Sequence, residues 1–216
     1  MGQGTPVCFN DGCTDISALG VDCHSSISSD IVTQMRLGLQ SERARRNEKL
    51  AVQGKCPRSL DVSVHDVFRL GTIQGARAIH LEDQLGSIEE GKLADLVIFD
   101  ALSPGMVCAE EQDPVAAIVL HSSIRDIETV IVDGKIRKRS GKLVAVDVDP
   151  SVPGVSITQR RVEWKDIVRE LLRSRNEIEE RIVQNEANDL AHMVNSSIKL
   201  FRINGDDLVP LAKAVS

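Results

Sequence analysis

The chain has 216 residues and a net charge of −6 at pH 7, with 42% apolar residues and only 2% aromatic ones. The scarcity of aromatic side chains excludes a stacking platform for single-stranded nucleic acid, and the acidic balance disfavours binding to nucleic acid or to an anionic membrane. No apolar run approaches the roughly 20 residues that cross a bilayer, and residues 1–6 lack the features of a signal peptide, so we expect a cytoplasmic protein.

The five cysteines are widely spaced, and no two of them form a C-x-x-C pair: Cys8, Cys13, Cys23, Cys56 and Cys108. This spacing excludes zinc-ribbon and thioredoxin-like motifs. In a cytosolic protein such residues are reduced thiols, so no disulfide framework is expected.

A short apolar run, residues 16–21, ends abruptly at Asp22. This pattern predicts a buried strand that delivers a polar side chain at its C-terminal end. A serine-rich turn follows, in which Ser29 or Asp30 can cap the next helix.

Two helices are expected before residue 80. Apolar residues four apart predict the first over residues 31–47, with a charged, solvated end from residue 42 to residue 49. Ser63 and Asp66 form a variant of the capping box and mark the start of the second.

A small β layer is expected after residue 80. The β-branched runs at residues 96–99, 116–120 and 130–132 predict strands, and residues 143–148 a further one. Asp133-Gly134 predicts a two-residue hairpin turn, and Ser140-Gly141 turns the chain again. Asp95 is interpreted as a structural anchor for a turn.

The last part of the chain is predicted to be a linker followed by helix. Residues 149–154 contain two prolines, and a helical pattern extends from residue 162 to about residue 200. The pairs Ile167/Leu171 and Ile178/Ile182 give this helix an apolar stripe. The stripe can contact the rest of the chain or a partner chain, which leaves a homo-oligomer open.

Three segments together resemble the amidohydrolase superfamily, in particular its chlorohydrolase, deaminase and guanine-deaminase-like branch. The first runs from L-G-V-D-C-H-S-S to M-R-L-G-L (residues 19–39), the second is T-I-Q-G-A-R-A-I-H-L through L-A-D-L-V-I-F-D (residues 72–100), and the third is V-I-V-D-G-K-I-R-K-R-S-G-K-L (residues 130–143). Their order and spacing make the resemblance specific.

The resemblance implies an α/β fold: the last strand and helices of a (β/α)8 barrel in residues 1–80, a small β layer in residues 81–148, and a linker with a helical extension in residues 149–216. It also implies hydrolysis of non-peptide C–N bonds in a small heterocyclic amine or cyclic amide.

In this family, Asp22 is expected to contact a divalent metal, zinc or iron, and to accept a proton from the metal-bound water. His24 and Ser26 are candidate substrate-binding residues. For each residue an alternative without a catalytic or binding role stays open: Asp22 caps the next helix, His24 is solvated, and Ser26 satisfies backbone groups of its turn.

Most of the ligands for such a metal are missing from the sequence. A hydrolytic site needs several histidines around one ion, and the family supplies an H-x-H pair. The chain has five histidines, none in an H-x-H pair: His24, His65, His80, His121 and His192.

Three hypotheses follow. The chain is a truncated hydrolase that is inactive alone; or it is a non-catalytic protein that binds a full-length amidohydrolase through its β layer and C-terminal helix; or it contributes Asp22 to a site whose histidines lie on another chain.

Overall fold

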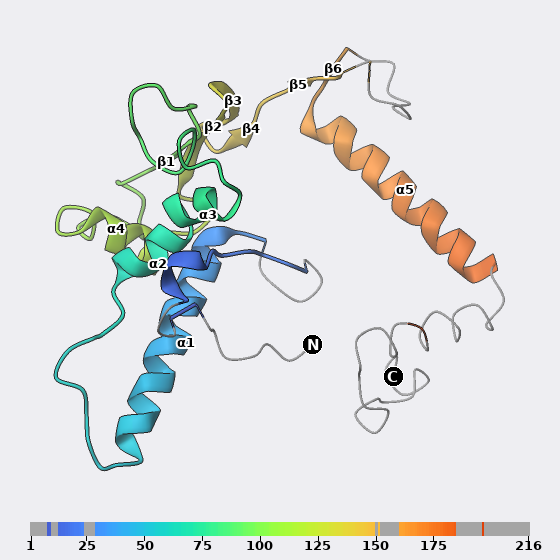
Figure 1. Cartoon of the computed structure of the whole chain (residues 1–216). Helices are drawn as coiled ribbons and strands as arrows, with labels where there is room; N and C mark the ends of the chain where they lie inside the picture. Colours follow the sequence, from blue (N-terminus) through green and yellow to red (C-terminus); the bar gives the residue numbers. More distant parts are fainter. Residues whose placement is uncertain are drawn as a thin grey trace. The chain divides into compact units, whose positions relative to one another are not determined.

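A computed structural model describes residues 8–9, 13–23, 29–149, 151, 160–184 and 196. Internal contacts divide the chain into two compact units, residues 1–147 and residues 148–216 (Figure 1). The first unit contains a group of helices and an antiparallel sheet, and the second contains one long helix.

The longest helix of the first unit is α1, Ile31–Ala51. Asp30 is its N-cap, with the Asp30 carboxylate accepting from the Thr33 amide at 2.7 Å. Met35 and Leu39 are buried in the core, as the four-residue spacing predicts. The helix extends four residues beyond the predicted end at residue 47.

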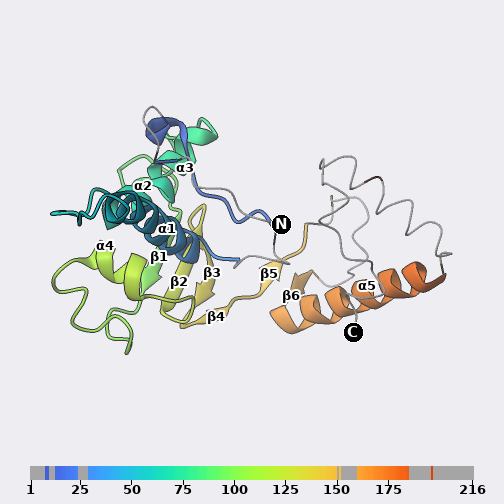
Figure 2. The same ribbon diagram turned by 90° about the horizontal axis from the view of Figure 1, so that it is seen from below.

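Two short helices follow α1 in the chain: α2, Val64–Leu70, and α3, Ile73–Ala78. The predicted capping box is confirmed, because the Ser63 hydroxyl accepts from the Asp66 amide while Asp66 accepts from the Ser63 amide at 2.8 Å. Helices α1 and α2 lie side by side (Figures 1 and 2). One core cluster joins them to flanking segments: Phe9, Met35, Leu39, Val62, Val64, Val67, Leu70 and Val119.

The sheet has the order β1-β2-β3-β4, and every neighbouring pair is antiparallel. Its strands are β1, Leu96–Phe99; β2, Ile127–Val132; β3, Lys135–Arg139; and β4, Lys142–Leu143. Both predicted turns are present: Asp133 and Gly134 join β2 to β3 with φ of 50° and 70°, and Ser140 and Gly141 join β3 to β4 with φ of 49° and 74°. Positive φ at both central residues is what a type I′ hairpin requires.

Asp95 fastens the start of β1 to the tip of the first hairpin. Its carboxylate accepts from the Asp133 amide at 2.7 Å, and the Gly134 amide donates to the Ala94 carbonyl at 3.1 Å. Lys92, just before it, donates to the Glu82 carbonyl and to the Ser87 hydroxyl, each at 2.6 Å, and so closes the loop that leads into the sheet.

The strand predicted at residues 116–120 is wrong. This segment is the short helix α4, Pro114–Ala116, followed by one π-helical turn, η2, Ala117–His121. Asp113 caps α4 by accepting from the Val115 and Ala116 amides, and Pro114 occupies the first position. A short apolar run does not by itself distinguish strand from buried helix, and here the Asp-Pro cap decides.

Arg36 of α1 binds the end of η2. Its guanidinium donates to the Val119 carbonyl at 2.8 Å and to the Ser122 carbonyl at 2.5 Å. The last carbonyls of a helix receive no hydrogen bond from a following turn of the same helix. A cationic side chain such as Arg36 can supply the missing donor.

The strand predicted over residues 143–148 is broken into the end of β4 and a separate two-residue strand, β5, Val146–Asp147. The second unit contains β6, Arg161–Val162, and α5, Trp164–Gln184. The rest of the predicted helix, beyond residue 184, lies outside the described residues except for Ser196. Within the described part of the chain, no helix has the length and apolar character needed to cross a membrane.

Candidate functional site

The segment that carries Asp22 is not a strand. A single 3-10 turn, η1, Thr14–Ile16, precedes it, and residues 17–23 have no regular secondary structure. Ile16, predicted to begin a buried strand, is 80% exposed. An extended segment needs neighbouring strands to bind its backbone, and the sheet strands of the described residues pair with one another instead.

Local hydrogen bonds hold this segment against the helices. The Leu19 amide donates to the Leu70 carbonyl at the end of α2, at 3.4 Å, and the Ser17 hydroxyl donates to the Cys13 carbonyl at 2.8 Å. Asp22 itself is exposed and has a φ of 60°. Aspartate tolerates this left-handed conformation better than most residues, and the turn presents its carboxylate to solvent.

The other two residues predicted for the site, His24 and Ser26, lie outside the described residues. Of the remaining histidines, His192 also lies outside them, and His65 is in α2, 3.5 Å from the Asp113 carboxylate. His121 is the last residue of η2.

A metal site cannot be built from the described residues. In the parts of the chain that the structure describes, no three histidine, cysteine, aspartate or glutamate side chains lie close enough together to hold a metal ion. A divalent metal therefore does not fit this part of the protein by itself.

A buried charged cluster is centred on Glu42 in α1, so the expectation that residues 42–49 form a solvated helix end is wrong for Glu42. The Glu42 side chain is 0% exposed and accepts two hydrogen bonds from Arg45, at 2.6 and 2.7 Å, and one from Arg46, at 2.7 Å. The hydrogen bonds from Arg45, together with those from Arg46 and the positive charge of both groups, hold the pKa of Glu42 below its ordinary value despite the opposing effect of burial. The spacing of three and four residues along a helix was the available sign of this cluster.

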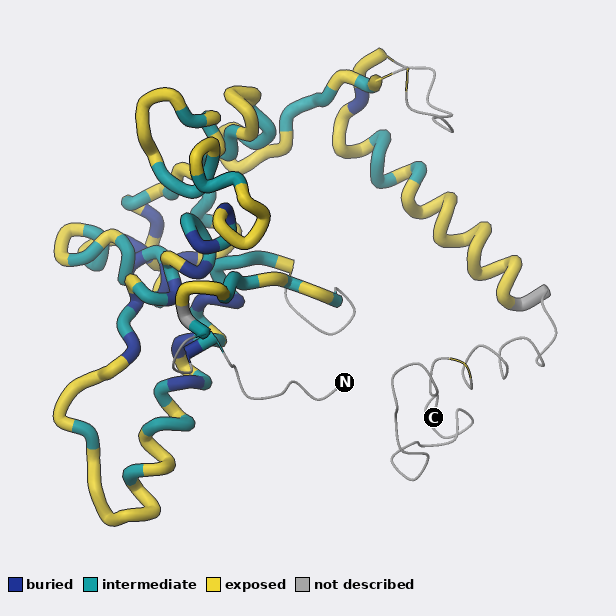
Figure 3. Tube along the Cα trace, in the orientation of Figure 1, coloured by how far each residue is buried: buried dark blue, intermediate teal, exposed yellow. Residues whose placement is uncertain are grey.

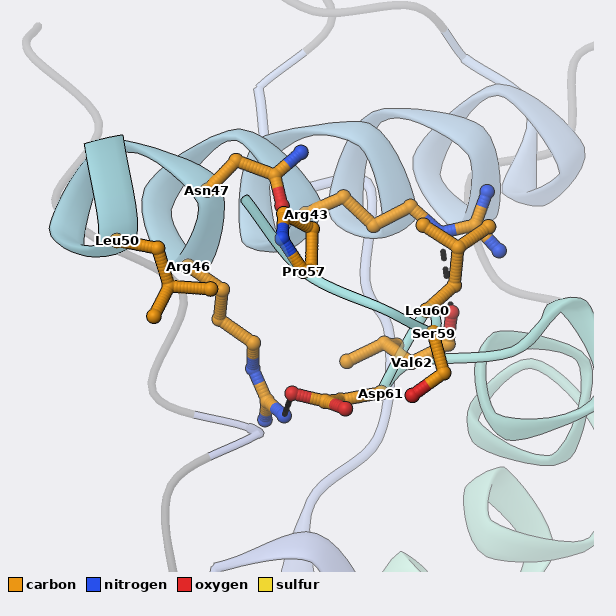
Figure 4. A pocket seen from close by; sticks show the side chains of 9 residues that line it. All are labelled: Arg43, Arg46, Asn47, Leu50, Pro57, Ser59, Leu60, Asp61 and Val62. Carbon is orange, nitrogen blue, oxygen red and sulfur yellow. Dashed lines mark hydrogen bonds and ion pairs between the residues drawn. The ribbon is translucent and has the colours of Figure 1, made fainter. Parts of the chain in front are cut away.

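This cluster serves the fold. Arg46 also reaches the Phe9 carbonyl at 3.4 Å and the Asp61 carboxylate at 3.7 Å, while Arg43 donates to the Val62 carbonyl at 3.0 Å (Figure 4). The arginines therefore tie the loop after α1 and the segment before it to one helix. The shallow pocket between them contains no histidine or cysteine, and its acid, Asp61, already faces Arg46.

Cys8 lies beside this cluster and is not prepared for nucleophilic chemistry. Burial raises the pKa of the Cys8 thiol above its ordinary value, and the charge of Glu42 adds to the rise. Since the thiolate is the reactive form, the raised pKa makes Cys8 a weaker nucleophile than an ordinary cysteine.

The sequence model of the amidohydrolase family matches residues 9–137. The chain belongs to the amidohydrolase family. The match begins before the Asp22 segment and ends inside β3, so it covers the helices and most of the sheet. The resemblance seen in the sequence is confirmed, and the helices and antiparallel sheet agree with a part of an amidohydrolase fold.

Several curated relatives of this chain are deaminases by name. The 5-methylthioadenosine/S-adenosylhomocysteine deaminase of Moorella thermoacetica is 35% identical over 88 residues, which are 41% of this chain and 20% of that protein. The 5′-deoxyadenosine deaminase of Methanobrevibacter smithii is 28% identical over 138 residues, 64% of this chain and 29% of that protein. The chain thus spans less than a third of the length of these relatives.

Among solved structures, the zinc-bound adenosine deaminase of Xanthomonas campestris is similar, with 24% identity and a TM-score of 0.49. The similarity covers 61% of this chain and 27% of that one.

Proposed function

We propose that this chain forms the C-terminal portion of a hydrolase that acts on a non-peptide C–N bond. We further propose that this bond joins the exocyclic amino group to the purine ring of an adenosine derivative altered at its 5′ position. The observation that supports the proposal most is the continuous family match over residues 9–137. The names of the relatives, deaminases of 5′-deoxyadenosine and of 5-methylthioadenosine or S-adenosylhomocysteine, support the substrate class.

Within that reaction, Asp22 is proposed as the proton acceptor for the attacking water. A carboxylate can act as a general base where it reaches the water. The hydrogen bond from the Leu19 amide to the Leu70 carbonyl, which holds the segment before Asp22 on α2, supports this role. His24 and Ser26, two and four residues further on, are proposed to contact the substrate.

The boundaries expected from the sequence are retained as part of the proposal. Residues 1–80 correspond to the end of the barrel, residues 81–148 to the small β layer, and residues 149–216 to an extension. Because the described residues hold no metal cluster, we propose that the chain alone binds no stoichiometric metal and has no deaminase activity.

Fusion to the missing portion of a relative tests the proposal. The part of the Methanobrevibacter smithii enzyme that precedes its aligned 138 residues is joined to residue 8 of this chain. Ammonia release from 5′-deoxyadenosine and the metal content of the purified protein are measured. We expect activity and bound metal in the fusion and neither in the chain alone.

Two variants of the fusion test the role of Asp22. We expect Asp22→Asn to lower kcat by at least about a hundredfold, the lower end of what general-base removal costs, with the metal content measured in parallel. Asp15→Asn, the same change at an exposed acid seven residues earlier, is the matched control and should retain activity. An active Asp22→Asn fusion contradicts the assigned role, and a folded, metal-loaded fusion that releases no ammonia contradicts the substrate class.

A further inference from the structure

Helix α5, Trp164–Gln184, lies beyond the family match, and five of its eight apolar residues lie on a seven-residue repeat, while Ile167, Leu172 and Val183 lie beside it. Steps of four and three residues connect Trp164, Val168, Leu171, Arg175, Ile178 and Ile182, so that Arg175 is the one polar member of the stripe. A repeat of this kind is typical of helices that pair lengthwise with another helix.

Most of α5 is exposed to solvent (Figure 3). Within the stripe, Leu171 is 57% exposed, Ile178 51%, Ile182 52% and Trp164 52%, while Val168 is half-buried. With Leu172 beside them, these side chains expose roughly 500 Å² of mostly apolar surface on one helix. Two such helices that cover one another completely remove at most roughly 1,000 Å² from water, which is the lower limit for a specific interface.

The charges of α5 are balanced overall but unequally distributed. The helix has five cations and five anions: Lys165, Arg169, Arg173, Arg175 and Arg181 against Asp166, Glu170, Glu177, Glu179 and Glu180. Residues 164–174 carry a net charge of +1 (three cations, two anions), and residues 175–184 carry −1 (two cations, three anions). The helix is therefore complementary in charge to a reversed copy of itself.

We propose that α5 forms an antiparallel helix pair with α5 of a second copy of this chain. In the register that sets Val168 opposite Ile178 of the second copy, Trp164 lies opposite Ile182. Arg175 then lies opposite Leu171, where its aliphatic stem covers the leucine and its head remains at the surface with Glu179, its partner at 3.4 Å in the same helix. A parallel pair sets Arg175 against Arg175 and like-charged halves together.

The molar mass of the full chain in solution tests the pairing. Sedimentation equilibrium or light scattering should show a monomer–dimer equilibrium at concentrations up to about 100 μM, a range that captures even a weak interface. Ile178→Asp places a charge in the stripe and should weaken the dimer at least about tenfold. Asn176→Asp, the same new residue off the stripe of the same helix, should leave the dissociation constant unchanged.

Circular dichroism confirms that each variant keeps its helix. Leu171→Ala, which retains helix propensity while shortening one stripe residue, should also weaken the dimer. A wild-type chain that is monomeric throughout the concentration range overturns the proposal, and so does a dimer that Ile178→Asp and Leu171→Ala leave intact.

Cross-linking tests the antiparallel direction. Isotopically labelled and unlabelled chains are mixed and coupled with a carbodiimide, and mixed-isotope peptides are identified by mass spectrometry. Lys165, the one lysine of α5, and Glu179 each directly follow a stripe residue, so the antiparallel pair sets Lys165 beside Glu179 of the other copy and predicts a link between them. A link from Lys165 to Asp166 or Glu170 of the other copy, or a dimer without the Lys165–Glu179 link, overturns it.

Discussion

Helices α1 and α5 are both 21 residues long, yet they bury their side chains differently. In α1 the apolar stripe enters a core, and even the acid Glu42 is covered. In α5 the apolar residues are about half exposed, and the ion pairs, such as Arg173–Glu177 at 3.8 Å, are solvated. The difference shows that an amphipathic pattern specifies which face is apolar but not what covers it.

The largest effect is expected from replacing one leucine in each helix by alanine, because the two variants should change the free energy of unfolding by very different amounts. Leu39 is 0% exposed, so Leu39→Ala leaves a cavity and should lower the free energy of unfolding of the first unit by about 3 kcal/mol. Leu171→Ala, the same change in α5, should alter it by less than about 0.5 kcal/mol. Hydrogen exchange of the α1 and α2 amides measures both values, and an equal loss from the two variants would contradict the comparison.

Removing the charge of Glu42 should have the next largest effect. Glu42→Gln leaves two guanidinium groups without their anion, but Arg45 and Arg46 are 25% and 33% exposed and can be hydrated in part. We therefore expect the free energy of unfolding of the first unit, measured by chemical denaturation, to fall by about 2 kcal/mol. Glu48→Gln, an exposed acid six residues on in the same helix, is the control and should stay within about 0.5 kcal/mol of wild type in the same chemical denaturation.

The same carboxylate should make the fold sensitive to acid. Because the pKa of folded Glu42 lies below its ordinary value of 4.5, its stabilisation is complete above pH 4.5 and is lost as the pH falls through the lower, folded-state pKa. Denaturation at a series of pH values should show a smaller acid-induced loss in Glu42→Gln than in wild type. Parallel curves for the two proteins would refute the assignment.

Loss of the N-cap of α2 should lower the free energy of unfolding by less than the loss of the Glu42 charge. Ser63→Ala removes the hydroxyl that accepts from the Asp66 amide, and such caps contribute about 1 kcal/mol. The loss should appear in the free energy of unfolding of the first unit. Ser59→Ala, in the loop ahead of the same helix, serves as the comparison, because Ser59 is exposed and caps no helix.

The smallest effect is expected in α5. Glu179→Gln breaks the exposed pair with Arg175, and an i,i+4 pair of this kind contributes about 0.3 kcal/mol to its helix. Helix content by circular dichroism should fall only slightly. A large drop would mean that the solvated pairs of α5 matter as much as the buried cluster of α1.

Features set by neighbouring residues were predictable from the sequence. The caps at Asp30 and Ser63 and the two hairpin turns depend on contacts a few residues apart, and the structure confirms them. The capping of α4 was equally local, but the β-branched run after Pro114 concealed it.

Features that depend on distant partners were not predictable in the same way. Residues 16–21 have the composition of a buried strand but no strand beside them, and Glu42 is buried because Arg45 and Arg46 fold over it while the chain near Phe9 covers the helix. The position of Asp22 depends on the hydrogen bond from the Leu19 amide to the Leu70 carbonyl at the end of α2, and no pattern in residues 16–22 predicts that contact.

The contact between Arg36 and η2 also orders events during synthesis. Its two acceptors lie 83 and 86 residues further along the chain, and Val119, one of them, belongs to the same core as Leu39. At typical elongation rates of 5–20 residues per second, α1 waits roughly 4–17 s on the ribosome before these acceptors exist. Residues 62–70 of the same core are made well before that, so α1 can pack on α2 first and receives the Val119 part of its cover only at the end of this interval.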